Sequence, residues 1–97
     1  MPRSVVERRL VEVNRRLKQA REELVVLDQQ LAALAGEADD ARVRALVSDS
    51  PMAQREHREA QRHADAMARS RQATLSAIAA HERTIDELLD RLVVDSR

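Results

Sequence analysis

The sequence predicts an all-α protein, an antiparallel two-helix coiled-coil hairpin, and three observations carry this prediction. Apolar residues recur at alternating spacings of four and three through the first part of the chain, which is the period of a coiled coil. A second long segment follows a helix-start signal at Ser50 and Pro51 and contains no further Gly or Pro. A short polar stretch separates the two segments, so we expect them to fold back on each other as a single domain over residues 1–97.

The first helix is predicted over about residues 4–47. Ser4 and Glu7 form an S-x-x-E capping box, in which each side chain satisfies a free backbone N–H near the other. The 4-3 spacing then keeps one face of the helix against a partner helix. The residues at this spacing are Val6, Leu10, Val13, Leu17, Ala20, Leu24, Leu27, Leu31 and Leu34.

Gly36 raises a question about the course of this helix. It could end the helix as a left-handed cap, and the aspartates that follow could then start a short extra helix. The 4-3 spacing nevertheless continues through Ala38, Ala41 and Ala45, and a Gly inside a helix costs only about 1 kcal/mol. The continuation favours one long helix with a kink at 36–39, followed by a turn at 48–50.

The second helix is predicted over about residues 51–94. Ser50 can cap it, and Pro51 at the first helical position loses no needed hydrogen bond. Large apolar residues dominate its C-terminal half, and Ala dominates its N-terminal half. An antiparallel register that pairs Val6 with Leu92 also sets the Ala-rich part of one helix against the Ala-rich part of the other.

Apolar side chains outside the expected helix–helix contact predict self-association. Two helices alone bury one stripe each, and such thin cores are marginal. Two hairpins that form a four-helix bundle dimer would bury the surplus, and docking on a different, unidentified protein is the alternative. The candidate contact residues are Val5, Val11, Val25, Val26, Val93 and Val94.

The composition narrows the classes of function. Charged residues make up 35% of the chain and balance to a net charge of zero, which speaks against generic binding of polyanions such as nucleic acid. Phe, Tyr and Trp are absent, so no aromatic platform exists on which bases could stack. No stretch is apolar enough for a signal peptide or a membrane span, and the lack of Cys fits the cytoplasm. We expect a soluble cytoplasmic protein, and the richness in Ala, Arg, Val and Asp indicates a bacterial source.

Catalytic residues, metal ligands and cofactors are not expected, and the protein is predicted not to be an enzyme. The serines stand in no nucleophile motif, and no Gly-rich phosphate loop occurs. Metal sites in helix bundles use Glu-x-x-His motifs, and none of His57, His63 and His81 stands in one. His81 is expected at the helix–helix contact, where a polar residue disfavours wrong registers.

A basic stripe marks the second helix. Arg55, Arg62, Arg69 and Arg83 share one heptad position, with Arg58 beside them, and such a stripe could follow a phosphate backbone. Glu59 and Asp65 lie among them at spacings that favour Glu59–Arg62 and Asp65–Arg69 ion pairs. We therefore predict a solvated face with internal salt bridges.

The function that these patterns favour is protein–protein interaction, as a scaffolding or adaptor module. An alternative comes from the acids toward the turn, Asp39, Asp40 and Asp49. A hairpin with an acidic tip resembles, in outline, the Gre-type factors that enter the secondary channel of RNA polymerase. In that family the tip carboxylates approach the catalytic Mg²⁺, an ion that carboxylates bind readily. The resemblance implies a regulator that inserts these three aspartates into a nucleic-acid machine.

Overall fold

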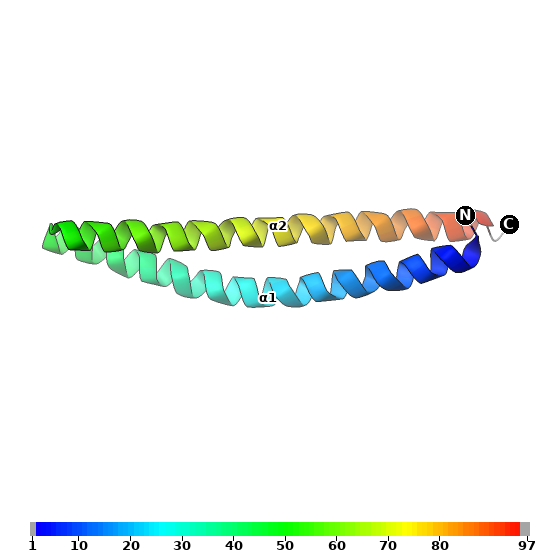
Figure 1. Ribbon diagram of the computed structural model, residues 1–97, viewed down its shortest axis with the longest axis horizontal. Helices are drawn as coiled ribbons and strands as arrows, with labels where there is room; N and C mark the ends of the chain where they lie inside the picture. Colours follow the sequence, from blue (N-terminus) through cyan, green and yellow to red (C-terminus); the bar gives the residue numbers. More distant parts are fainter. Residues whose placement is uncertain (1, 96–97) are drawn as a thin grey trace. The chain divides into compact units, whose positions relative to one another are not determined.

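The computed structural model describes residues 2–95, which form two long helices joined by a short connection (Figure 1). Helix α1 comprises Arg3–Ser48 and helix α2 comprises Pro51–Asp95, which confirms the all-α helical hairpin. Contacts divide the chain into two compact units, and each contains a segment of both helices. Unit 1 comprises Met1–Leu24 and Ala73–Arg97, and unit 2 comprises Val25–Gln72.

Large aliphatic side chains hold unit 1 together. Apolar area removed from water stabilises a fold by about 25 cal/mol per Å², and a cluster of aliphatic side chains buries much of this area in the unit. The partners that the predicted register pairs, such as Val6 and Leu92, lie in that cluster. Arg21 Nη2 and Glu82 Oε1 add an ion pair of 3.6 Å between the helices at the surface. The cluster consists of Val6, Val13 and Leu88, with Leu10, Ile85 and Leu92 packed against them.

Unit 2 packs mainly through alanines. Ala38, Ala41 and Ala45 of α1 are buried, as are Ala53 and Ala64 of α2. A methyl side chain lets two helix backbones approach closely, but it removes little apolar area from water. Because the same small side chain recurs at successive turns, shifting one helix along the other changes the contacts little. Alanine packing by itself therefore selects the register of the two helices only weakly.

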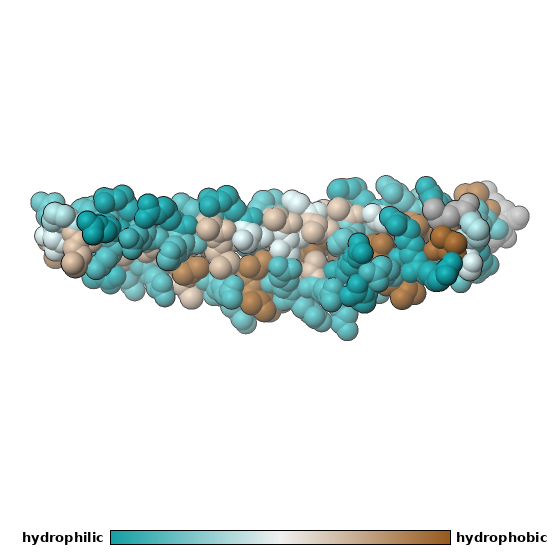
Figure 2. Space-filling model, viewed as in Figure 1, coloured by the Kyte–Doolittle hydropathy of each residue, from teal (hydrophilic) through white to brown (hydrophobic). Residues whose placement is uncertain are grey.

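The 4-3 spacing identifies the buried face of both helices. Every residue at this spacing from Val6 to Ala45 in α1, and from Ala53 to Leu92 in α2, is buried or half-buried. We call these two rows of residues the seam. Hydrophilic residues cover most of the face seen in Figure 2, and apolar groups form separate patches among them.

Helix α1 passes through Gly36 without a break, so the short extra helix considered after Gly36 does not form. Gly36 is exposed and has no positive φ. A Cβ placed on it meets nothing within 4 Å. Burial of the seam alanines that follow, Ala38, Ala41 and Ala45, offsets the cost of a helical glycine.

Helix α1 begins at Arg3, before the predicted start. The Pro2 carbonyl accepts a hydrogen bond from the N–H of Val5 at 3.1 Å, and Ser4 therefore lies inside the first turn. The Glu7 carboxylate accepts a hydrogen bond from Arg3 Nε at 2.8 Å. The predicted Ser4–Glu7 capping box is wrong, because a backbone carbonyl closes the first turn and an arginine takes the carboxylate.

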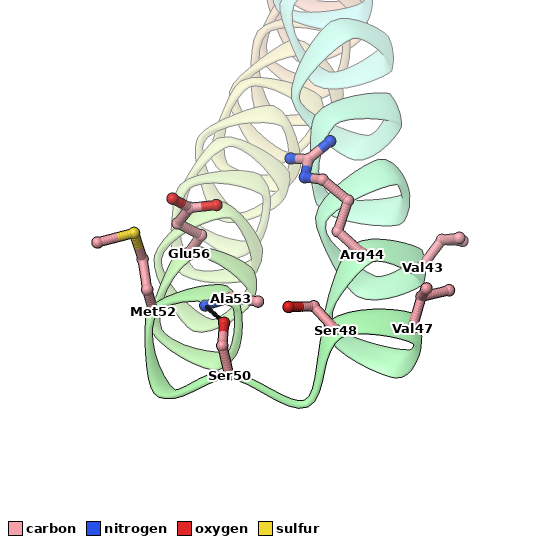
Figure 3. A pocket seen from close by; sticks show the side chains of 8 residues that line it. All are labelled: Val43, Arg44, Val47, Ser48, Ser50, Met52, Ala53 and Glu56. Atoms are coloured by element: carbon pink, nitrogen blue, oxygen red, sulfur yellow. Dashed lines mark hydrogen bonds between the residues drawn. The ribbon is translucent and has the colours of Figure 1, made fainter.

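The connection consists of Asp49 and Ser50, because Ser48 still belongs to α1. Asp49 has a φ of 49°, in the left-handed region that Asp visits more often than most residues. Its N–H donates to the Ala45 carbonyl at 3.3 Å, which is the bond of a left-handed helix cap. The Ser50 hydroxyl accepts a hydrogen bond from the N–H of Ala53 at 3.1 Å (Figure 3), so the predicted cap of α2 is confirmed.

Two polar side chains of α2, Arg71 and Gln54, bond to α1 in unit 2, and a third polar residue of α2, Thr74, is buried in unit 1. Arg71 Nε donates to Asp28 Oδ1 at 2.5 Å, and Gln54 Nε2, next to the seam, donates to the Ala45 carbonyl at 3.1 Å. Both bonds join α1 to α2. In unit 1, Thr74 is buried at a seam position. These polar contacts were not predicted.

Candidate interaction surfaces

Five of the six predicted contact valines are exposed, and Val5 is half-buried. They are divided between the two units. Val5 and Val11 lie on α1 in unit 1, and Val93 and Val94 lie on α2 in that unit. The remaining two, Val25 and Val26, lie on α1 in unit 2 and are 58% and 49% exposed.

The α1 segment from Val25 to Gly36 presents a face without an unpaired charge, which we call the neutral face. Its single charged residue is Asp28, and the Asp28 carboxylate is already paired with Arg71. The other exposed residues of the segment are small or uncharged: Val25, Val26, Gln29, Gln30, Ala32, Ala33, Ala35 and Gly36. Another helix can come close to such a face, because few side chains project from it.

A second apolar surface lies beside the turn, where none was predicted. Val43 and Val47 of α1 and Met52 of α2 line a groove of about 440 Å³, which we call the tip groove. Met52 extends on the α2 side of the groove and the two valines on the α1 side (Figure 3). Val47 is 83% exposed and Met52 67% exposed. The residues that complete the lining are Arg44, Ser48, Ser50, Ala53 and Glu56.

A signal for the α1 side of this surface is present in the sequence. Val47 follows Val26 by three heptads, and exposed Leu46 follows Val25 by the same interval. Residues a whole number of heptads apart occupy the same position relative to the seam. The repeat that placed Val25 and Val26 outside the seam therefore also places Leu46 and Val47 there.

The arginine stripe of α2 is exposed in unit 2, and its predicted salt bridges are absent. Within residues 2–95, Arg55, Arg62 and Arg69 take part in no ion pair. The Asp65 carboxylate accepts a hydrogen bond from Gln61 Nε2 at 2.9 Å rather than pairing with Arg69. Glu59 likewise does not pair with Arg62 in the described part of the chain. The stripe is thus a row of guanidinium groups that face water.

The three candidate tip acids have separate surroundings. Asp39 Oδ1 pairs with Arg42 Nη2 at 2.9 Å on the surface of α1. Asp40 borders a groove of about 350 Å³ together with Glu37, Arg44 and Glu56. Asp49 occupies the left-handed position of the turn. Over residues 2–95, no three His, Asp or Glu side chains come close enough together to hold a metal ion.

The histidines differ in exposure. His57 and His81 are half-buried at seam positions, and His63 is exposed. The predicted position of His81 at the helix–helix contact is therefore confirmed.

Neither helix, over the residues described, contains a segment long and apolar enough to cross a membrane. Comparison of the chain with protein families, with curated proteins and with solved structures finds no match.

Proposed function

We propose that this protein is a non-enzymatic interaction module, a coiled-coil hairpin that pairs with a second copy of itself and serves as a scaffold or adaptor. The observation that carries the proposal is the neutral face, on which Val25 and Val26 are 58% and 49% exposed although the seam of the helix is already covered. Exposed β-branched side chains at adjacent positions favour a further helix against this face.

The residues of the neutral face complement one another in an antiparallel pair of α1 helices. A two-fold axis near Gln29 sets Val25 of one copy beside Ala33 of the other, and Val26 beside Ala32. A large side chain then meets a small one at each contact, and a two-fold interface repeats both contacts. Burying a fully exposed Val side chain stabilises by roughly 1.5–3 kcal/mol. Val25 and Val26 are 58% and 49% exposed, so each of the four valines supplies about half of this, and together they are the main driving force.

Electrostatics also support this pairing. Burial of an unpaired charge is costly, and the neutral face contains none, because Arg71 compensates Asp28. The exposed alanines Ala32 and Ala33 leave room for close approach of the second backbone. Two hairpins joined in this way contribute four helices, the arrangement of a four-helix bundle.

The alternative, a regulator that inserts an acidic tip into RNA polymerase, has less support. Asp39 is neutralised by Arg42, and over residues 2–95 no three Asp, Glu or His side chains lie close enough together to hold a metal ion. Apolar side chains are exposed beside the turn, with Val47 83% and Met52 67% exposed.

Sedimentation equilibrium with interference detection tests the pairing, since the chain has no Trp or Tyr. We expect the wild type to sediment as a dimer and the double variant Val25→Glu, Val26→Glu to sediment as a monomer of unchanged helicity. The matched control is Leu46→Glu, Val47→Glu, which makes the same change three heptads along α1 and leaves the dimer intact. A monomeric wild type, or equal behaviour of the two variants, contradicts the proposal.

A further inference from the structure

We infer that the outer face of α2 beside the turn binds an acidic amphipathic helix of a partner protein. Carboxylates one heptad apart on that helix pair with Arg55, Arg62 and Arg69, and an apolar side chain at its end enters the tip groove beside Met52. This surface is separate from the neutral face of α1, so the inference does not depend on self-association.

The face is a continuous strip along α2 within unit 2. Its members follow one another at spacings of three and four, which is the period of one side of a helix. All of them are exposed, and they lie opposite the seam. The strip consists of Met52, Arg55, Glu59, Arg62, Ala66 and Arg69, and we call it the arginine face.

Its three arginines are available to a partner. No carboxylate of residues 2–95 lies within ion-pair distance of them, and Gln61 holds the nearby Asp65 carboxylate. Guanidinium groups bind carboxylates through two parallel hydrogen bonds. Arginines one heptad apart on a helix are spaced by about 10.5 Å, and a helix that lies alongside repeats its own carboxylates at the same interval.

The charge pattern favours a protein helix over nucleic acid or an anionic membrane. Glu56, Glu59 and Asp65 lie among the arginines, and a continuous row of phosphates would meet each of them as a like charge. A helix can place a Lys opposite Glu59 and a Glu opposite each arginine. The whole chain is neutral and contains no aromatic residue, so neither long-range attraction nor base stacking favours a nucleic acid.

The tip groove gives the helix an apolar anchor. Met52 begins the arginine face and also lines the groove with Val43 and Val47. Its side chain is 67% exposed, and Met adapts its shape to an incoming apolar group. Surface ion pairs are worth only about 0.2–1 kcal/mol each, so the anchor supplies affinity while the arginines fix the alignment and the direction of the partner.

A labelled synthetic peptide of three heptads tests the inference by fluorescence anisotropy with the full chain. The probe carries one Glu in each heptad, a Lys placed to meet Glu59, and a terminal Leu. A second peptide has the same composition with its glutamates clustered. We expect the first peptide to bind at least about tenfold more tightly than the second, a difference of about 1.4 kcal/mol, and its affinity to fall as salt rises.

Charge-matched variants assign the binding to the arginine face. The triple variant Arg55→Gln, Arg62→Gln, Arg69→Gln is expected to lose at least about tenfold in affinity for the first peptide. The control variant Arg8→Gln, Arg9→Gln, Lys18→Gln removes the same charge from α1 and is expected to retain binding. Met52→Gln is expected to weaken binding without changing its preference for the first peptide.

Three results overturn the inference: no binding of the first peptide, equal binding of both peptides, or equal losses in the two triple variants. A short DNA duplex and phosphatidylserine vesicles serve as further probes. Tighter binding of either one, if it is lost in the triple arginine variant, shows that the face recognises a polyanion instead. These binding experiments do not measure self-association, which sedimentation of the wild type tests separately. A failure of the helix-binding inference can therefore be told apart from a failure of the proposed dimer.

Discussion

Arg71 Nε donates a hydrogen bond to Asp28 Oδ1 from a seam position where the 4-3 repeat of α2 predicts an apolar side chain. The bond joins α1 to α2 in unit 2, where the packing residues are mostly alanines. A polar residue in a helix–helix contact stabilises less than an apolar one, but it meets its partner in only one register. Together with the bond from Gln54 to the Ala45 carbonyl, this pair selects the register that the alanines leave weakly specified.

Replacing Arg71 with Leu is expected to raise the thermal unfolding midpoint. A Leu at this seam position buries more apolar area, which stabilises by about 1 kcal/mol or more. The lost ion pair is half exposed, screened by water, and worth at most about 1 kcal/mol. Thermal unfolding followed by circular dichroism measures the midpoint. The matched control is Asp28→Ala, which leaves Arg71 in the seam without the Asp28 carboxylate as a partner and is expected to lower the midpoint. A lower midpoint for Arg71→Leu would show that the pair dominates stability here.

Replacing Gly36 with Ala is expected to stabilise the protein by about 1 kcal/mol, the difference in helix propensity between the two residues. The new methyl group meets nothing within 4 Å, and the backbone of Gly36 already has no positive φ. Urea unfolding measures the change. The reverse substitution at the exposed neighbour, Ala35→Gly, is expected to destabilise the protein by a similar amount. If both variants changed the free energy of unfolding in the same direction, this would contradict a regular helix through this position.

The left-handed conformation of Asp49 predicts opposite effects for two substitutions. Gly adopts a φ of 49° without strain, so Asp49→Gly is expected to maintain or raise stability. A β-branched residue is strained there, and Asp49→Val is expected to cost roughly 1–2 kcal/mol. Urea midpoints of the two variants compare them directly. Greater stability of the Val variant would exclude the left-handed turn.

Two adjacent leucines in unit 1 are expected to differ widely in their contribution to stability. Leu88 is 3% exposed in the aliphatic cluster, whereas its neighbour Leu89 is 46% exposed. Truncation of a buried Leu to Ala costs about 2–5 kcal/mol, and we expect the lower part of this range for Leu88→Ala because a two-helix core can collapse around the gap. Leu89→Ala is expected to cost much less. Similar losses in chemical denaturation would contradict the predicted register.

Two arginines determine the titration of Glu12. Hydrogen bonds from Arg15 and then Arg16, with Arg15 Nη2 at 2.7 Å, lower the pKa of the Glu12 carboxyl from its ordinary 4.5 to about 2. A group whose pKa is depressed in the folded state stabilises that state above its unfolded pKa, and the contribution disappears as the pH falls through the folded pKa. We therefore expect part of the stability to be lost between pH 4.5 and about 2.

Carboxyl NMR shifts recorded against pH measure this titration. In Arg15→Gln the pKa of Glu12 is expected to move back toward its ordinary value, since the strongest hydrogen bond to the carboxylate is removed. In Glu12→Gln the acid-dependent loss of stability is expected to be smaller than in the wild type. An unchanged titration of Glu12 after removal of Arg15 would show that the arginine does not lower this pKa.

The candidate surfaces were predictable in part. Val25 and Val26 were singled out because they interrupt the polar side of a helix, and they are exposed as expected from their heptad positions. Leu46 and Val47 occupy the same positions three heptads later, at the end of the predicted helix, and were not singled out. Sequence spacing also predicted that Asp65 would pair with Arg69. In the structure Gln61, one turn earlier on the same helix, competes for that carboxylate.

The sequence by itself determined the two helices, the cap at Ser50 and the buried face, because helix periodicity and capping are local properties that spacing records. The 4-3 repeat specified every seam position of α1 from Val6 to Ala45, including the passage through Gly36. Only the tertiary structure decided that Arg71 donates a hydrogen bond to Asp28 and that Gln54 donates one to the Ala45 carbonyl. These contacts join residues far apart in the chain, and their formation depends on which side chains the antiparallel packing brings within hydrogen-bonding distance.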